Sequence, residues 1–163
     1  MKAQWSKCGR FAGVVCLASL LSVFVTADRA VAQQGKYITE ATVELIKMVN
    51  TANGAGYKLQ DNSFSIGGGW LRQSASTWVP LYTVQLQGGR DYRFLASGDA
   101  DARDVDLRVL DSNNQVVASD ASTARNALVN YRPTNTGRFT VQIRLYSSAN
   151  NLPCVCLGIV MSK

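Results

Sequence analysis

Between residues 81 and 161, apolar and polar side chains alternate with a period of two, and this alternation limits the fold more than any other feature. Tyr92, Phe94 and Ala96, for example, share one face of an extended segment, while Arg93 lies on the other face. The pattern predicts strands at residues 81–87, 91–97, 105–110, 115–119, 127–131, 138–146 and 155–161. Clusters of glycine, asparagine and proline separate these segments, as expected for tight turns.

Shorter strands are predicted at residues 57–59, 63–66 and 70–73, and the glycines at 67–69 indicate a bulge or a close approach of another chain segment. About eight short strands separated by turns, with no helices alternating between them, predict an all-β fold: an antiparallel, jelly-roll-like β-sandwich. We also expect strands 91–97 and 105–110 to form a hairpin, with one face in the core and the other face in water.

Before the strands, the period changes to that of a helix. Apolar residues recur at three- and four-residue spacing, at Ile38, Ala41, Leu45, Met48 and Val49, which predicts an amphipathic helix at about residues 40–52. Thr39 is the expected N-cap, and the glycines at 54 and 56 are the expected stop. We expect residues 33–56 to pack as a helical segment on a sandwich formed by residues 57–163.

The first 32 residues have the pattern of a cleaved signal peptide. A basic start is followed by an apolar run at residues 11–25 and by Ala30-Val31-Ala32, the small-x-small pattern that precedes cleavage. The apolar run is shorter than the roughly 20 residues that a membrane-spanning helix needs. We therefore expect cleavage after Ala32, export to the periplasm or the exterior, and no stable membrane insertion afterwards.

Composition excludes several functions. Of the 17 Lys and Arg, four lie in the leader, and of the 11 Asp and Glu, one does, so the remaining chain has a net charge of only +3. That balance is not typical of nucleic-acid-binding proteins. The chain contains no histidine, the commonest general base. We expect one domain, a monomer, and no catalytic residues.

A family resemblance follows from a series of residues in the strand region. The order Gly89, Tyr92, Asp104-Val-Asp-Leu107, Val109, Asp120, Thr136-Gly137, Phe139, Val141 and Ile143 resembles bacterial pre-peptidase C-terminal domains, secreted β-sandwiches appended to exported peptidases. The resemblance covers about residues 81–146. It departs from the family at Phe139, where tyrosine is usual, and in the absence of a peptidase from this chain. It implies a non-catalytic accessory or binding module at the cell envelope, with a protein or a polysaccharide as partner.

Some members of that family bind calcium, and the resemblance implies that Asp99, Asp101, Asp104, Asp106 and Asp120 are the residues that could do so here. Clustered carboxylates suit Ca²⁺, which takes six to eight oxygen ligands. No cofactor is otherwise required. The alternative is that cross-strand pairs with Arg93, Arg103, Arg108 and Arg144 neutralise these carboxylates.

Three further hypotheses remain open. Trp70, Trp78 and Tyr82 could stack on a sugar ring, which would make the chain a carbohydrate-binding or adhesion module. Glu40, Glu44 and the aspartates could serve a carboxylate-dependent hydrolase, although no spacing singles out a pair. Cys154 and Cys156 point the same way in a strand, and they could be buried free thiols, a strained local disulfide, metal ligands or partners in intermolecular pairing.

Overall fold

The computed structural model describes residues 15–59 and 65–163, with side chains from Gly35 onwards. Residues 37–163 form one compact unit, to which all the contacts below belong. The elements are helix α1 (Val15–Gly54), strands β1 (Ile66–Leu71), β2 (Val79–Leu86), β3 (Tyr92–Gly98), β4 (Ala102–Leu110), β5 (Val116–Asp120), β6 (Asn126–Tyr131) and β7 (Gly137–Ser148), the short 3₁₀ helix η1 (Ala149–Asn151) and strand β8 (Cys154–Ser162).

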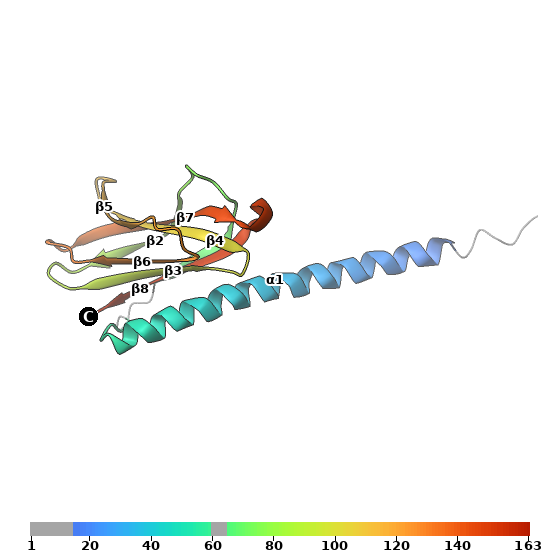
Figure 1. Ribbon diagram of the computed structural model, residues 1–163, viewed down its shortest axis with the longest axis horizontal. Helices are drawn as coiled ribbons and strands as arrows, with labels where there is room; N and C mark the ends of the chain where they lie inside the picture. Colours follow the sequence, from blue (N-terminus) through green and yellow to red (C-terminus); the bar gives the residue numbers. More distant parts are fainter. Residues whose placement is uncertain (1–14, 60–64) are drawn as a thin grey trace, which may run out of the picture. The chain divides into compact units, whose positions relative to one another are not determined.

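The strands form two four-stranded antiparallel sheets, which confirms the predicted β-sandwich (Figure 1). The first sheet has the order β1-β8-β3-β6 and the second sheet the order β2-β7-β4-β5. The predicted hairpin between β3 and β4 is wrong, because these consecutive strands lie in different sheets. Alternation shows only which side chains of a strand face the core. Two strands in the same sheet and two strands in opposite sheets of a sandwich have the same alternation, so the pattern could not show which arrangement β3 and β4 adopt.

The core lies between the two sheets and is filled by the apolar side chains of the alternating pattern. Phe94 of β3, Leu107 of β4 and Val141 of β7 are completely buried in it. Burial of such side chains is the main source of stability in a domain of this size. The alternation thus predicted the core-facing residues of the central strands.

Helix α1 is longer than predicted, and its part after residue 36 packs on the outer face of the first sheet. It runs through Thr39, which therefore is not an N-cap, because the preceding residues are rich in helix-forming alanine and glutamine. Its predicted stop is confirmed: Gly56 has φ +90° and donates to Asn53 O, and Tyr57 N donates to Ala52 O, which is a Schellman motif.

A second apolar cluster joins α1 to the first sheet. Leu45 and Ala52 of α1 are buried against Leu95 of β3 and against Ile159 and Met161 of β8. The two central strands of the first sheet, β3 and β8, are therefore buried on both faces, and the prediction of a water-exposed outer face on β3 is wrong. The predicted helix face was correct except at Ile38, which is 51% exposed.

The strand boundaries before β2 differ from those predicted. Residues 67–69 lie inside β1, and a Cβ at Gly67 would come within 2.7 Å of Leu81 O, so the predicted close approach is present without a break in the strand. Pro80 lies within β2, which it can do because β2 is an edge strand. Of the predicted strand at 57–59 only a bridge between Lys58 and Ser162 exists. Of the predicted strand at 63–66, residues 63 and 64 lie outside the described residues, and Ile66 is the first residue of β1. In the described part of the chain, no helix is long and apolar enough to span a membrane.

Candidate binding surface on the second sheet

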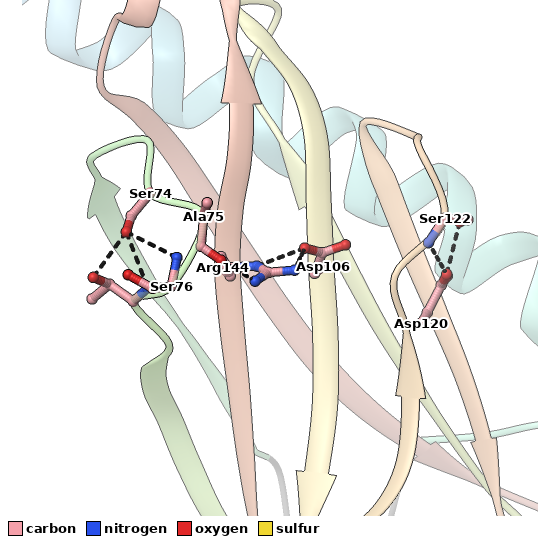
Figure 2. Close-up of polar contacts among 8 residues, drawn as sticks. Ser74, Ala75, Ser76, Asp106, Asp120, Ser122 and Arg144 are labelled. Atoms are coloured by element: carbon pink, nitrogen blue, oxygen red, sulfur yellow. Dashed lines mark hydrogen bonds and ion pairs between the residues drawn. The ribbon is translucent and has the colours of Figure 1, made fainter.

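The loop between β1 and β2 folds across the outer face of the second sheet. Ser74 N donates to Leu145 O at 2.9 Å, and the Ser74 hydroxyl accepts from Thr77 N at 3.0 Å, which closes a tight turn. Arg144 of β7 also donates to the carbonyl of Ala75 (Figure 2). These contacts fix residues 74–77 of the loop, and they thereby position Trp78, which follows Thr77, over the sheet.

Trp78 lies against two guanidinium groups of the second sheet. The guanidinium carbon of Arg108 is 4.2 Å from the centre of a Trp78 ring, and that of Arg144 is 4.6 Å from it. Arg144 is also 4.9 Å from the ring centre of Tyr146, which is 45% exposed. We call the surface formed by Trp78, Arg108, Gln142, Arg144 and Tyr146 the Trp78 face. It combines aromatic rings with positive charge.

The two arginines of the Trp78 face differ in how their charge is compensated. Arg144 pairs with the buried carboxylate of Asp106, whose Oδ2 accepts from Nε at 2.7 Å and lies 2.6 Å from Nη2 (Figure 2). Arg108 donates from Nε to Gln142 Oε1 at 2.8 Å. In the part of the chain that the structure describes, Arg108 belongs to none of the ion pairs. The predicted cross-strand pairing of the aspartates with arginines thus holds for Asp106 and Arg144.

Asp104 lies on the same strand as Asp106 and is buried without full compensation. Its side chain is 6% exposed, and Oδ1 has no hydrogen-bond partner. Burial raises the pKa of the Asp104 carboxyl, and the negative charge of Asp106 raises it further; Arg144 acts in the opposite direction. The expectation that this face of β4 is in water is therefore wrong for both aspartates.

Replacement of Asp104 by asparagine is expected to stabilise the protein at pH 7. Because the pKa is raised by folding, ionisation of Asp104 costs stability above the folded pKa, and this cost disappears as the pH falls below the unfolded pKa. We expect Asp104→Asn to gain about 1 kcal/mol at pH 7, since an uncompensated buried polar group costs about that much or more. Urea unfolding between pH 3 and pH 8 measures the gain, which should shrink as the pH falls. A gain that is equal at every pH, or a loss at pH 7, would contradict this assignment.

Of the other three aspartates proposed for calcium, Asp99 and Asp120 accept hydrogen bonds in separate turns, and Asp101 takes part in the Asp99 turn through its backbone. Asp99 is fully buried, and its carboxylate accepts from Val155 N at 2.6 Å and from Asp101 N at 3.0 Å. Asp120 accepts from Leu128 N, from Ser122 N and from the Ser122 hydroxyl. Burial acts to raise the pKa of Asp120, but these hydrogen bonds outweigh it and lower the pKa. Among the described residues, no group of three or more carboxylate, thiol or imidazole side chains is arranged to hold a metal ion.

The three aromatic residues considered for sugar binding do not meet at one surface. Trp70 lies on β1 of the first sheet, 48% exposed, with its ring centre 5.4 Å from that of Tyr37. Tyr82 packs against the core, its hydroxyl is buried, and burial raises its pKa. Only Trp78 lies on the second sheet's outer surface beside other polar groups.

Cys154 and Cys156 are free, buried thiols on the core face of β8, so the structure does not join them in the disulfide that was considered. Alternate residues of an extended strand have Cα atoms about 6.8 Å apart, at the upper limit for a disulfide. Burial raises the pKa of the Cys154 thiol to about 12, and Asp99 contributes to the increase. Both thiols are thus poor nucleophiles at neutral pH.

The two glutamates considered for a hydrolase lie on α1, away from the Trp78 face. Glu44 pairs with Lys47 at 2.7 Å and with Arg125 at 3.1 Å, and the hydrogen bond from Lys47 is the main cause that lowers its pKa. Glu40 accepts from Ala100 N at 3.2 Å. A general acid needs a raised pKa, so Glu44 does not have the properties of one.

Sequence reasoning missed Arg108, Gln142 and Tyr146 as parts of a site. Each lies at an outward position of a strand with alternating side chains, so the sequence did indicate that each faces away from the core. Their association depends on the register of β4 against β7, in which Arg108 is opposite Gln142, and on the position of the loop that carries Trp78. The spacing of residues along the chain predicts neither this register nor the position of the loop.

No protein-family model and no curated protein sequence matches the chain. Solved structures resemble it in fold. One is the pre-peptidase C-terminal domain of a collagenase from Bacillus anthracis, 10% identical with a TM-score of 0.46, which covers 60% of this chain and 88% of that one. Another is a periplasmic inhibitor of g-type lysozyme from Aeromonas hydrophila, 9% identical with a TM-score of 0.42, which covers 65% of this chain and 93% of that one. Identities this low concern the fold alone. The strand pairing of the chain itself shows a two-sheet antiparallel β-sandwich, and the pre-peptidase C-terminal domain is one of the solved folds to which it is similar.

Proposed function

We propose that this chain is an exported, non-catalytic module of the cell envelope that binds a polysaccharide at the Trp78 face. The observation that carries the proposal is the contact of Trp78 with two arginines on an outward sheet surface. An aromatic ring fixed beside hydrogen-bonding side chains offers a sugar ring both an apolar surface and polar partners. The leader pattern of residues 1–32 supports export.

Three neighbouring features support a ligand site over a purely structural cluster. Trp78 is only half-buried, Tyr146 is 45% exposed, and Gln142 lies beside Arg108 with its amide oxygen accepting from Arg108 Nε. The loop that carries Trp78 is tied to β7 by hydrogen bonds, so the ring is held in place before any ligand binds. Such preorganisation lowers the entropic cost of binding.

Replacement of Trp78 by alanine is expected to abolish polysaccharide binding. Native affinity electrophoresis against a panel of neutral and acidic polysaccharides should show retardation of the parent chain by at least one of them. Loss of the stacking surface should weaken that binding by about tenfold or more. Trp70→Ala is the matched control, because it removes an exposed tryptophan from the first sheet and should leave binding unchanged.

The proposal fails if no polysaccharide retards the parent chain, or if Trp70→Ala weakens binding as much as Trp78→Ala does. Thermal melting of each variant separates loss of the site from loss of the fold. If Trp78→Ala does not fold, Trp78→Phe keeps part of the stacking surface and should give an intermediate affinity.

A further inference from the structure

We propose that the polysaccharide bound at the Trp78 face carries carboxylate groups, and that Arg108 is the side chain that binds the carboxylate. The inference rests on the proposed function and adds the class of ligand. It depends on the difference between the two arginines that contact Trp78.

Arg144 has no charge left to offer a ligand. Its guanidinium is held by the Asp106 carboxylate and by the carbonyl of Ala75, and its side chain is only 15% exposed. Asp106 is 2% exposed, so this pair is part of the protein's interior. A ligand would have to break a buried ion pair in order to use Arg144, which is strongly unfavourable.

Arg108, in contrast to Arg144, is held in place without an ion pair among the described residues. Its Nε donates to Gln142, and its guanidinium carbon lies 4.2 Å from the Trp78 ring centre, so the side chain is fixed. Within the described ranges no carboxylate forms an ion pair with it. Burial lowers the pKa of the guanidinium, and so does the nearby positive charge of Arg144. This face of the sheet is therefore complementary to an anion.

The surroundings of Arg108 favour a sugar acid over other anions. In the register of the second sheet, Ser119 of β5 and Gln142 of β7 lie on either side of Arg108. Residues directly opposite each other in antiparallel strands share a face. A hydroxyl and an amide both donate and accept, which suits the hydroxyls of a sugar ring. A guanidinium binds a carboxylate through two parallel hydrogen bonds, and a single carboxylate balances the one uncompensated charge.

The first sheet provides a matched control for Arg108. Arg93 of β3 donates from Nε to Asn130 Oδ1 at 2.8 Å, and its guanidinium carbon lies 4.2 Å from the ring centre of Tyr57. The two arginines thus have the same amide contact and the same stacking distance, on opposite sheets. Arg93→Gln and Arg108→Gln remove equal charge from the protein, so a general electrostatic effect would be equal in both variants.

The test measures the affinity of the full chain for polygalacturonate, alginate and hyaluronate at low and at physiological salt. At least one of these acidic polysaccharides should bind, and Arg108→Gln should weaken that binding by about tenfold or more. Arg93→Gln should leave it within about twofold. Methyl-esterified or carboxyl-reduced forms of the same polysaccharide should bind as weakly to the parent chain as the charged polymer does to Arg108→Gln.

Four outcomes would overturn the inference: no acidic polysaccharide binds, Arg108→Gln binds as tightly as the parent, Arg93→Gln loses as much affinity, or poly-L-glutamate competes as strongly as the sugar polymer. The last outcome would indicate an acidic peptide as the ligand. Binding of a neutral polysaccharide that Trp78→Ala abolishes and Arg108→Gln preserves would overturn this inference while upholding the proposed function. If Arg108→Gln does not fold, Arg108→Lys keeps the charge without the planar fork and should still weaken binding severalfold.

Discussion

Asp106→Asn is expected to lower the free energy of unfolding by about 3 kcal/mol. The substitution keeps the shape of the side chain and removes the charge that compensates Arg144, which is only 15% exposed. A guanidinium left unpaired in so dry a position is strongly destabilising, and the cost exceeds what an exposed ion pair would contribute. Urea unfolding at pH 7, followed by circular dichroism, measures the difference.

The double variant Asp106→Asn/Arg144→Gln shows whether the effect is due to the unpaired charge. With both charges removed, the buried site is neutral, and we expect most of the lost stability to return. Asp111→Asn, at a half-buried acid of the β4–β5 turn that belongs to none of the ion pairs among the described residues, is a control that should cost much less. If Asp106→Asn costs under about 1 kcal/mol, the pair with Arg144 contributes as little as a surface ion pair does.

Asp99→Ala should be similarly destabilising, by about 3 kcal/mol, for a different reason. The Asp99 carboxylate accepts from the backbone N–H groups of Val155 and Asp101, and its own N–H donates to Val155 O at 2.9 Å. It therefore fixes the crossing from β3 to β4 against the start of β8. Removal of the carboxylate leaves two N–H groups without acceptors, that of Val155 buried and that of Asp101 partly buried, and a buried N–H without an acceptor costs about 1–3 kcal/mol.

Asp101→Ala is the matched control for Asp99→Ala. It changes a carboxylate of the same turn, yet the contacts of Asp101 in this turn are made by its backbone, which accepts from Ala149 N at 2.8 Å and donates to Asp99. We expect a change within about 0.5 kcal/mol. If Asp101→Ala is as destabilising as Asp99→Ala, and millimolar Ca²⁺ raises the melting temperature of the parent alone, then the two carboxylates share an ion and the structural role of Asp99 is wrong.

Residue types alone predicted only part of the candidate site. Aspartates clustered along the sequence suggested a single cation site, but the fold divides them between a buried turn, an ion pair with Arg144 and the cap of the turn after β5. The fold also separates the three aromatic residues: Trp70 lies on the first sheet, Tyr82 packs against the core, and Trp78 lies on the outer face of the second sheet. The sequence indicated Trp78 as a candidate, but only the pairing of β4 with β7 shows that Arg108 and Arg144 lie beside it.

The sequence by itself determined the class of fold. Side-chain alternation is a local property of extended chain, and it showed which residues face the core of the sandwich, just as the helical period showed the buried face of α1. Only the tertiary structure decided which sheet each strand joins, which residues lie opposite each other, and that α1 closes the outer face of β3. These relations join residues dozens of positions apart, such as Asp106 and Arg144, and no short-range pattern records which distant partner a strand will choose.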